Sequence, residues 1–145
     1  MPLEIQRITD PSDFDAFVDI QIAAFADGGG MTALLSPNPA PADYRQKIVD
    51  RQIQSFNEEP DVVYLKVIDT DLNGKIIAAA KWRINTKERT EEEVQKMYPQ
   101  LDEKDKNNQV LVDFWAFLGR VRKQYMGTKP FYCESYKNMS EGIQC

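Results

Sequence analysis

The sequence has no histidine and only two cysteines. The lack of an imidazole excludes Ser-His-Asp and Cys-His catalysis, and it also excludes every metal site that uses histidine. Cys133 and Cys145 alone cannot form a four-thiolate zinc site or a disulfide framework. We therefore expect no metal site in this chain, and thiols that stay reduced as in intracellular proteins.

Basic residues and long apolar runs are also scarce. Eighteen Lys and Arg stand against 23 Asp and Glu, which gives a formal net charge of −5. A nucleic-acid partner is not expected, because phosphate binding needs a basic face. No run approaches the roughly 18 apolar residues of a membrane span, and the first residues lack the basic-then-apolar order of a signal peptide. We expect a cytoplasmic protein without a membrane partner.

The helical part of the chain is clear from its apolar spacing. The 145 residues are 42% apolar and 28% charged, as in a globular domain. Apolar residues recur at helical spacing in three long segments, about 11–26, 41–57 and 107–126. A shorter helix is expected after Thr90, a suitable N-cap. Most aromatic side chains on the long helices, including Phe117, are expected in the core.

The strands form a smaller set. Residues 3–8 alternate apolar and polar side chains, which predicts a short strand. Residues 62–68 and 75–84 are rich in β-branched and aromatic residues and flank Asn73-Gly74, so they predict a β-hairpin. The expected fold is therefore α/β (α+β), with a three-stranded antiparallel sheet packed with three long helices.

Three short motifs partly match ligand-binding loops. Asp69–Gly74 matches the opening half of an EF-hand, but the twelfth position, which needs a glutamate, is Ala80. Gln124–Lys129 partly matches the Q/R-x-x-G-x-G/A pattern of pyrophosphate loops, but its sixth residue is lysine and it ends a helix. Gly28–Gly30 also follows a helix, where the dipole repels phosphate. A hairpin turn and two helix caps are the favoured interpretations.

Several stretches, taken in order, resemble a known family. They are Leu3–Asp10, Ala23–Ala26, Val67–Trp82 and Tyr125–Pro130. In this order they resemble the N-terminal half of GNAT superfamily N-acetyltransferases, in particular a fungal-type group. The resemblance covers about residues 3–130.

The resemblance implies a fourth strand after Pro130, then a pyrophosphate loop, its helix and further strands. That half binds acetyl-CoA in the family. Here residues 131–136 lead into a polar tail, so we expect a GNAT-like portion over 1–130 and an irregular tail over 131–145, with at most a stub of the fourth strand. No catalytic or cofactor-binding residue is carried over, and no cofactor is expected for this chain alone.

The family's acceptor pocket would border the first helix–loop–helix. The candidate pocket residues are Phe25, Met31, Leu35 and Trp82. Two function classes stay open. One is an N-acetyltransferase-related protein, transferring an acyl group from acetyl-CoA to a small-molecule or peptide amine, here truncated and inactive alone. The other is a non-catalytic interaction module or remnant. We also expect self-association or a completing chain, because the strand at 75–84 would have an unpaired edge.

Overall fold

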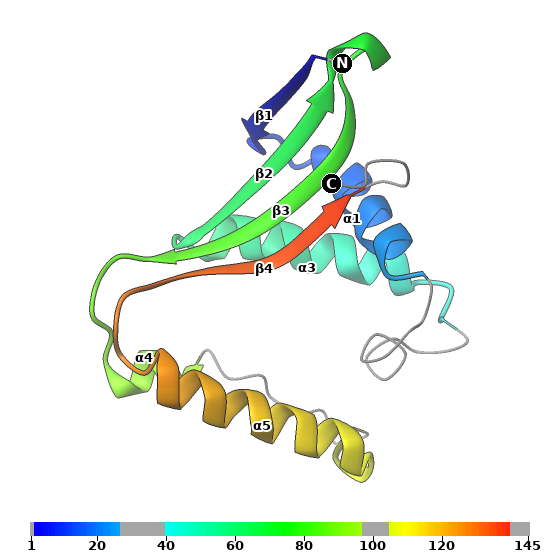
Figure 1. Cartoon of the computed structure of the whole chain (residues 1–145). Coiled ribbons are helices and arrows are strands. Elements are labelled where there is room, and N and C mark those ends of the chain that lie inside the picture. Colours follow the sequence, from blue (N-terminus) through cyan, green and yellow to red (C-terminus); the bar gives the residue numbers. More distant parts are fainter. Residues whose placement is uncertain (1, 27–39, 97–104, 140–145) are drawn as a thin grey trace.

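A curled four-stranded antiparallel sheet forms the centre of the molecule, and two helices lie against one of its faces (Figure 1). The computed structural model describes residues 2–26, 40–96 and 105–139. The elements are, in chain order, β1 (Leu3–Arg7), α1 (Asp13–Ala24), α3 (Tyr44–Glu58), β2 (Val62–Asp69), β3 (Lys75–Asn85), α4 (Glu91–Lys96), α5 (Gln109–Tyr125) and β4 (Phe131–Met139). The expected first strand, the three long helices, the hairpin and the short helix are confirmed.

The strand count differs from the expectation. The sheet order is β1-β2-β3-β4, and β4 pairs with β3 from Phe131 opposite Asn85 to Met139 opposite Ala78. A full strand therefore replaces the expected stub, and residues 131–139 are not irregular. The register between β3 and β4 shifts between Lys81 and Trp82. Such a bulge interrupts the alternation of side chains, which explains why no period of two is visible in the sequence.

This strand also changes the expectation for the sheet edge. β3 is paired on both sides, with β2 and with β4. Its backbone N–H and C=O groups are therefore satisfied, and the prediction of an open edge along residues 75–84 is wrong. In the described sheet the outer strands are β1 and β4.

The core lies between the sheet and the helices α1 and α3. Phe14, Phe17 and Val18 on α1 are completely buried against Tyr64 and Ala79. The ring centroids of Phe14 and Tyr64 are 4.8 Å apart and nearly perpendicular, which is the favourable edge-to-face arrangement. The small side chain of Ala79 allows α1 to approach the sheet closely. The apolar spacing of the first helix thus predicted its buried face correctly.

The hairpin turn between β2 and β3 is confirmed as a turn. A carboxylate oxygen of Asp69 accepts a hydrogen bond from the backbone N–H of Asp71 at 2.9 Å. Asn73 and Gly74 have φ values of 55° and 75°, the left-handed conformation that these two residue types tolerate best. The Asp-rich motif is therefore explained by turn geometry.

The ends of α4 and α5 follow their sequence signals. The Thr90 hydroxyl accepts from the backbone N–H of Glu93, and the Glu93 carboxylate accepts from the N–H of Thr90, which is a capping box. Gly127, at φ 49°, ends α5, so the helix-cap interpretation of Gln124–Lys129 is confirmed. The Arg89 guanidinium donates to the Gly127 carbonyl at 2.7 Å and thereby ties this end of α5 to the chain before α4.

The position of α5 corrects one expectation. None of its residues is buried, and Phe117 is 53% exposed. Its main contact among the described elements is with the 3-10 segment Asp105–Asn107 (Figure 1). Periodicity shows that a helix has an apolar face, but it does not show that the partner for this face is in the same chain. In the described part of the chain, no helix combines the length and the apolar character needed to cross a membrane.

Candidate functional site

A small hollow lies between the C-terminal half of α3 and strand β3. Its volume is about 280 Å³. Its lining residues are Arg51, Gln54, Ser55, Glu58, Glu59 and Lys81. All of these side chains are polar, and four of them are ionisable, so the hollow suits a small polar molecule or one polar group of a larger ligand.

The alternation of β3 and the turn of α3 bring these residues together. Lys81 and Arg83 occupy alternate positions of β3, on the face that carries the buried Ala79. Gln52 and Ser55 are three residues apart on α3, so both point toward the sheet, and both are buried. Two cations of the strand therefore meet the polar end of the helix.

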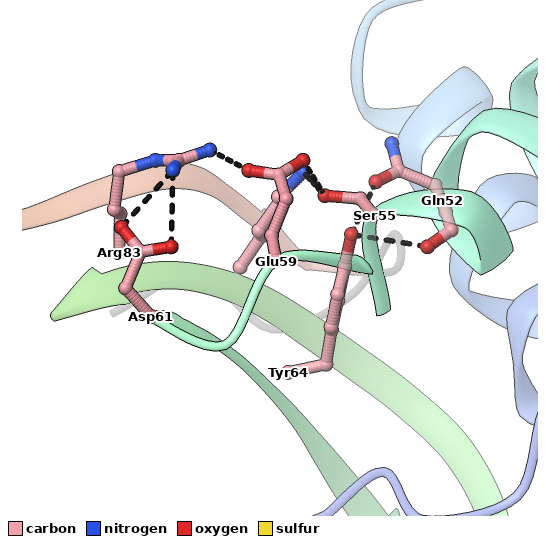
Figure 2. Close-up of polar contacts among 7 residues, drawn as sticks. Gln52, Ser55, Glu59, Asp61, Tyr64 and Arg83 are labelled. Atoms are coloured by element: carbon pink, nitrogen blue, oxygen red, sulfur yellow. Dashed lines mark hydrogen bonds and ion pairs between the residues drawn. The ribbon is translucent and has the colours of Figure 1, made fainter. Parts of the chain in front are cut away.

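The polar contacts form a chain across the site, as Figure 2 shows. The Lys81 ammonium donates to the Ser55 Oγ at 2.7 Å. The Ser55 hydroxyl in turn donates to the Glu59 carboxylate. The other oxygen of that carboxylate accepts from Arg83, whose guanidinium also pairs with Asp61 at 3.0 Å. Arg83 thus joins the two acidic side chains directly, and the Ser55 hydroxyl connects Lys81 to them.

Tyr64 closes the inner side of the cluster. Its hydroxyl donates to the side-chain oxygen of Gln52 at 2.8 Å, so the phenol at the centre of the core has a partner (Figure 2). The Lys81 Nζ lies 5.3 Å from the centroid of the Tyr64 ring, within the range of a cation–π interaction. The lysine is therefore held between an aromatic ring and the Ser55 hydroxyl.

The surroundings shift the pKa values of both charged groups that contact Ser55. Burial lowers the pKa of Lys81 below 10.5, because the charged amine is deprived of water, and the nearby Glu59 only partly opposes this. Burial acts to raise the pKa of Glu59, but the hydrogen bonds from Ser55 and Arg83 outweigh it, so this pKa lies below 4.5. The lowered pKa of Lys81 makes it easier for the lysine to lose its proton. The lowered pKa of Glu59 keeps the glutamate in its charged form.

This arrangement can bind and deprotonate a polar ligand. At a given pH an amine with a lowered pKa is neutral in a larger fraction of molecules than an exposed lysine, and only the neutral amine can accept a proton. Arg51 and Glu58 are exposed and add one charge of each sign to the lining of the hollow. Within the described ranges, no group of three or more histidine, cysteine or acidic residues is arranged to hold a metal ion.

Replacing Lys81 with methionine should remove an alkaline pH dependence of stability. The pKa of Lys81 is lower in the folded state than in the unfolded state, so the folded protein binds this proton more weakly. The free energy of unfolding of the parent chain, relative to Lys81→Met, should therefore rise as the pH increases through the lowered pKa toward 10.5. Urea denaturation at several pH values measures this difference.

The control for this prediction is the exposed Lys47, whose side chain is 67% accessible. Lys47→Met should change stability by a similar amount at every pH in the same range. A difference between the parent and Lys81→Met that stays constant with pH would contradict the role assigned to burial of this amine.

The pocket residues expected from the sequence lie elsewhere. Phe25 directly follows α1 and is 42% exposed. Trp82 lies on β3, on the face opposite to Lys81 and Arg83 and away from α1 and α3. The structure therefore does not bring Phe25 and Trp82 together. Met31 and Leu35 lie outside the described residues, and the assignment of an acceptor pocket to this region stays a prediction.

The cluster around Ser55 was not anticipated, although the sequence contains a signal for it. Lys81 and Arg83 are cations in alternate positions of a strand whose preceding residues, 76–80, are all isoleucine or alanine. Acidic residues occur at Glu58, Glu59 and Asp61, at the end of a predicted helix and before the paired strand. Cations on a sheet face that a helix covers need counter-charges, because an unpaired buried charge is costly. The acidic residues closest in the sequence, Glu58, Glu59 and Asp61, could supply them.

Comparison with known proteins shows the fold. No protein-family model and no curated protein sequence matches the chain. The structure matches that of histone acetyltransferase HPA2 and related acetyltransferase from Corynebacterium glutamicum, with a TM-score of 0.54 and 14% identity over 97% of this chain. It also matches the C-terminal condensation domain of Ebony in complex with beta-alanyl-dopamine, with a TM-score of 0.59 and 18% identity over 99% of this chain.

The chain spans less than two thirds of these neighbours, since the match covers 62% of each of the two. At such low identity the likeness concerns the arrangement of strands and helices, which here includes the antiparallel sheet and the two helices packed on its inner face. The chain therefore shares a GNAT-like fold with these two structures.

Proposed function

We propose that the chain is the acceptor-side portion of a GNAT-like N-acyltransferase, an enzyme type that transfers an acyl group from acetyl-CoA to an amine. The observation that carries this proposal is the structural likeness over nearly the whole chain to two proteins concerned with acyl groups. One is a histone acetyltransferase and the other holds beta-alanyl-dopamine, whose name describes an acyl group on an amine. The proposed acceptor is accordingly a small-molecule or peptide amine.

We further propose that the chain does not hold acetyl-CoA by itself and is inactive alone. Acetyl transfer requires a bound thioester, a donor for the oxyanion and a base for the amine. A pyrophosphate is normally held by backbone N–H groups where a strand leads into a helix. The three described glycines are Gly74 in the hairpin turn, Gly119 within α5 and Gly127 after α5, and none of these three occupies such a position.

The hollow at Lys81 supplies the acid–base groups of the proposal. The carboxylates of Glu58 and Glu59 attract an ammonium group, and the neutral form of Lys81, whose share its lowered pKa increases, accepts a proton from it. The proton passes from the ligand nitrogen to the lysine nitrogen, which leaves the ligand amine neutral. Lys81 is thus the proposed base for the acceptor, and Ser55 holds it in position through the hydrogen bond at 2.7 Å.

Calorimetric titration tests both halves of the proposal. The chain should give no binding heat with acetyl-CoA and should bind a probe amine such as dopamine weakly, with a loss of binding in Glu58→Gln. Gln46→Glu, a change at an exposed position in the N-terminal half of α3 and outside the hollow, is the control and should bind the amine as the parent does.

Two results would contradict the proposal. Micromolar or tighter binding of acetyl-CoA would refute the claim that the chain cannot hold the cofactor, and loss of that binding in Lys129→Ala would then place it at Gln124–Lys129. Amine binding that is unchanged in Glu58→Gln would show that the hollow is not the acceptor site.

A non-catalytic interaction module is the second candidate function. It is favoured by the apolar face of α5, which the described part of the chain leaves exposed. A monomeric soluble protein rarely exposes a contiguous apolar surface of this kind without a partner for it. This candidate does not exclude the first one, because the hollow at Lys81 and the helix α5 are separate parts of the chain.

A further inference from the structure

Helix α5 carries an apolar stripe that the described chain does not cover. Its members are Val110, Phe114, Phe117, Val121 and Tyr125. Val110 is 51% exposed, Phe117 53% and Tyr125 71%. Figure 1 shows α5 apart from the sheet and from the helices α1 and α3. These three side chains are therefore available to a partner, whereas Phe114 and Val121 are half-buried.

The spacing of the stripe is that of a helix that packs along another helix. From Val110 to Phe114, Phe117 and Val121 the steps are four, three and four residues. Alternating steps of three and four residues define the seam of a coiled coil, whose two positions are named a and d. Phe114 and Val121 take position a, and Val110 and Phe117 take position d. Among the described elements no other helix packs along this seam.

The charges beside the seam select the partner helix. Asp113 and Arg120 each precede an a residue, so they share one flank of the seam, while the other flank carries the apolar Leu111 and Leu118. In an antiparallel pair of identical helices, each flank lies beside the same flank of the other helix. A two-fold axis between Phe114 and Phe117 then places Asp113 of each copy beside Arg120 of the other.

These two side chains are available for such a pair. Within the described residues, Arg120 has no hydrogen bond or ion pair, and both side chains are exposed. Asp113 accepts a hydrogen bond from the exposed amide of Gln109 one helical turn away, which an incoming guanidinium can share or replace.

A parallel pair is less favourable for the same sequence. The charged flank of one helix would then lie beside the apolar flank of the other, which leaves Asp113 and Arg120 unpaired. The last two turns of α5 carry Arg120, Arg122 and Lys123, and a parallel pair would place two such basic ends together. The helix dipoles would also be aligned side by side, whereas an antiparallel pair opposes them.

We propose that α5 is a dimerisation helix, through which two copies of this chain pair antiparallel about a two-fold axis, with ion pairs between Asp113 of each copy and Arg120 of the other. The same residues contribute on both sides, as a symmetric interface requires. A seam of four residues is small beside the roughly 800 Å² per partner of a standard interface. The dimer is therefore reversible, with a dissociation constant in the micromolar range. This proposal does not depend on acyl transfer.

Sedimentation equilibrium from about 1 to 100 μM, a range that brackets a micromolar dissociation constant, tests the pairing through charge reversal. Asp113→Arg and Arg120→Asp should each weaken the dimer about 5- to 10-fold, because each single change replaces two attractions with two repulsions. The double variant Asp113→Arg with Arg120→Asp restores both attractions and should return the dissociation constant to within about 3-fold of the parent. Phe117→Glu should abolish the dimer.

Leu72→Glu is the matched control, because Leu72 is as exposed as Phe117 but lies on the hairpin turn between β2 and β3. It should leave the dissociation constant unchanged, and circular dichroism should show every variant to be folded. A monomeric parent at about 100 μM would overturn the proposal, and so would a dimer that tolerates Phe117→Glu. Failure of the charge swap to restore a dimer weakened by the single reversals would overturn the antiparallel arrangement.

Discussion

Replacing Phe14 with alanine should lower the free energy of unfolding by about 3–5 kcal/mol, the range for loss of a fully buried aromatic ring. Phe14 is completely buried and lies edge-to-face with Phe17, Phe56 and Tyr64. Its removal leaves a cavity at the point where α1, α3 and β2 meet, and the three remaining rings cannot collapse into it without leaving favourable geometry. Domains of this size are stable by only about 5–15 kcal/mol, so the variant should melt at a much lower temperature.

Phe117→Ala provides the control with the same chemical change. Phe117 lies on α5 with 53% of its surface exposed, and its replacement should cost no more than about 1 kcal/mol when measured at about 1 μM, where the proposed dimer is dissociated. Urea denaturation followed by tryptophan fluorescence measures both variants. Equal costs at the two positions would show that α1 does not pack in the core as described.

Sequence reasoning was reliable where local patterns and packing agree. The apolar spacing around Phe14, Phe17 and Val18 predicted the buried face of α1, because this helix has its partner in the same chain. The hairpin was equally clear, since Asn73-Gly74 supplies the left-handed conformations that its turn requires. In α1 and in the hairpin, the residues that favour the local conformation are also the residues that the tertiary packing requires.

The same reasoning failed where the structure depends on partners distant in sequence. The spacing of α5 is as regular as that of α1, but it contains no information on where a covering surface comes from, so Phe117 was wrongly placed in the core. Strand β4 was expected only as a stub, because its bulge opposite Lys81 and Trp82 interrupts the alternation that marks a strand. Its full length depends on pairing with the edge of β3 that β2 does not occupy. The alternation of its own side chains does not reveal it.

The candidate site was predicted least well, for a physical reason. Tyr64 comes from β2, whereas Gln52 and Ser55 come from α3, and each alone is an ordinary polar residue. Their importance lies in burial and in mutual distance, and neither property can be obtained from spacing along the chain. The charges of Lys81 and Glu59 could have indicated a pair, but not the serine hydroxyl between them or the shifts in their pKa values.

Replacing Arg83 with methionine should lower the free energy of unfolding by about 2 kcal/mol, between the values for exposed and for buried ion pairs. The Arg83 side chain is 23% exposed and pairs with both Glu59 and Asp61. Without it, two neighbouring carboxylates lose their common counter-charge, and the anchor of Glu59 beside Ser55 is lost as well. Thermal and urea denaturation at pH 7 measure this cost.

Arg45→Met is the matched control, because Arg45 also pairs with two carboxylates, those of Asp15 and Asp19, but in an exposed position. Its side chain is 40% exposed and its partners are about 60% exposed, so water screens the pair and the loss should be no more than about 1 kcal/mol. The double variant Arg83→Met with Asp61→Asn should recover part of the cost, because one of the two stranded charges is removed. If Arg83→Met and Arg45→Met lower the free energy of unfolding equally, burial does not strengthen the ion pairs of Arg83. The network around Ser55 would then stabilise the fold no more than the exposed pairs between α1 and α3.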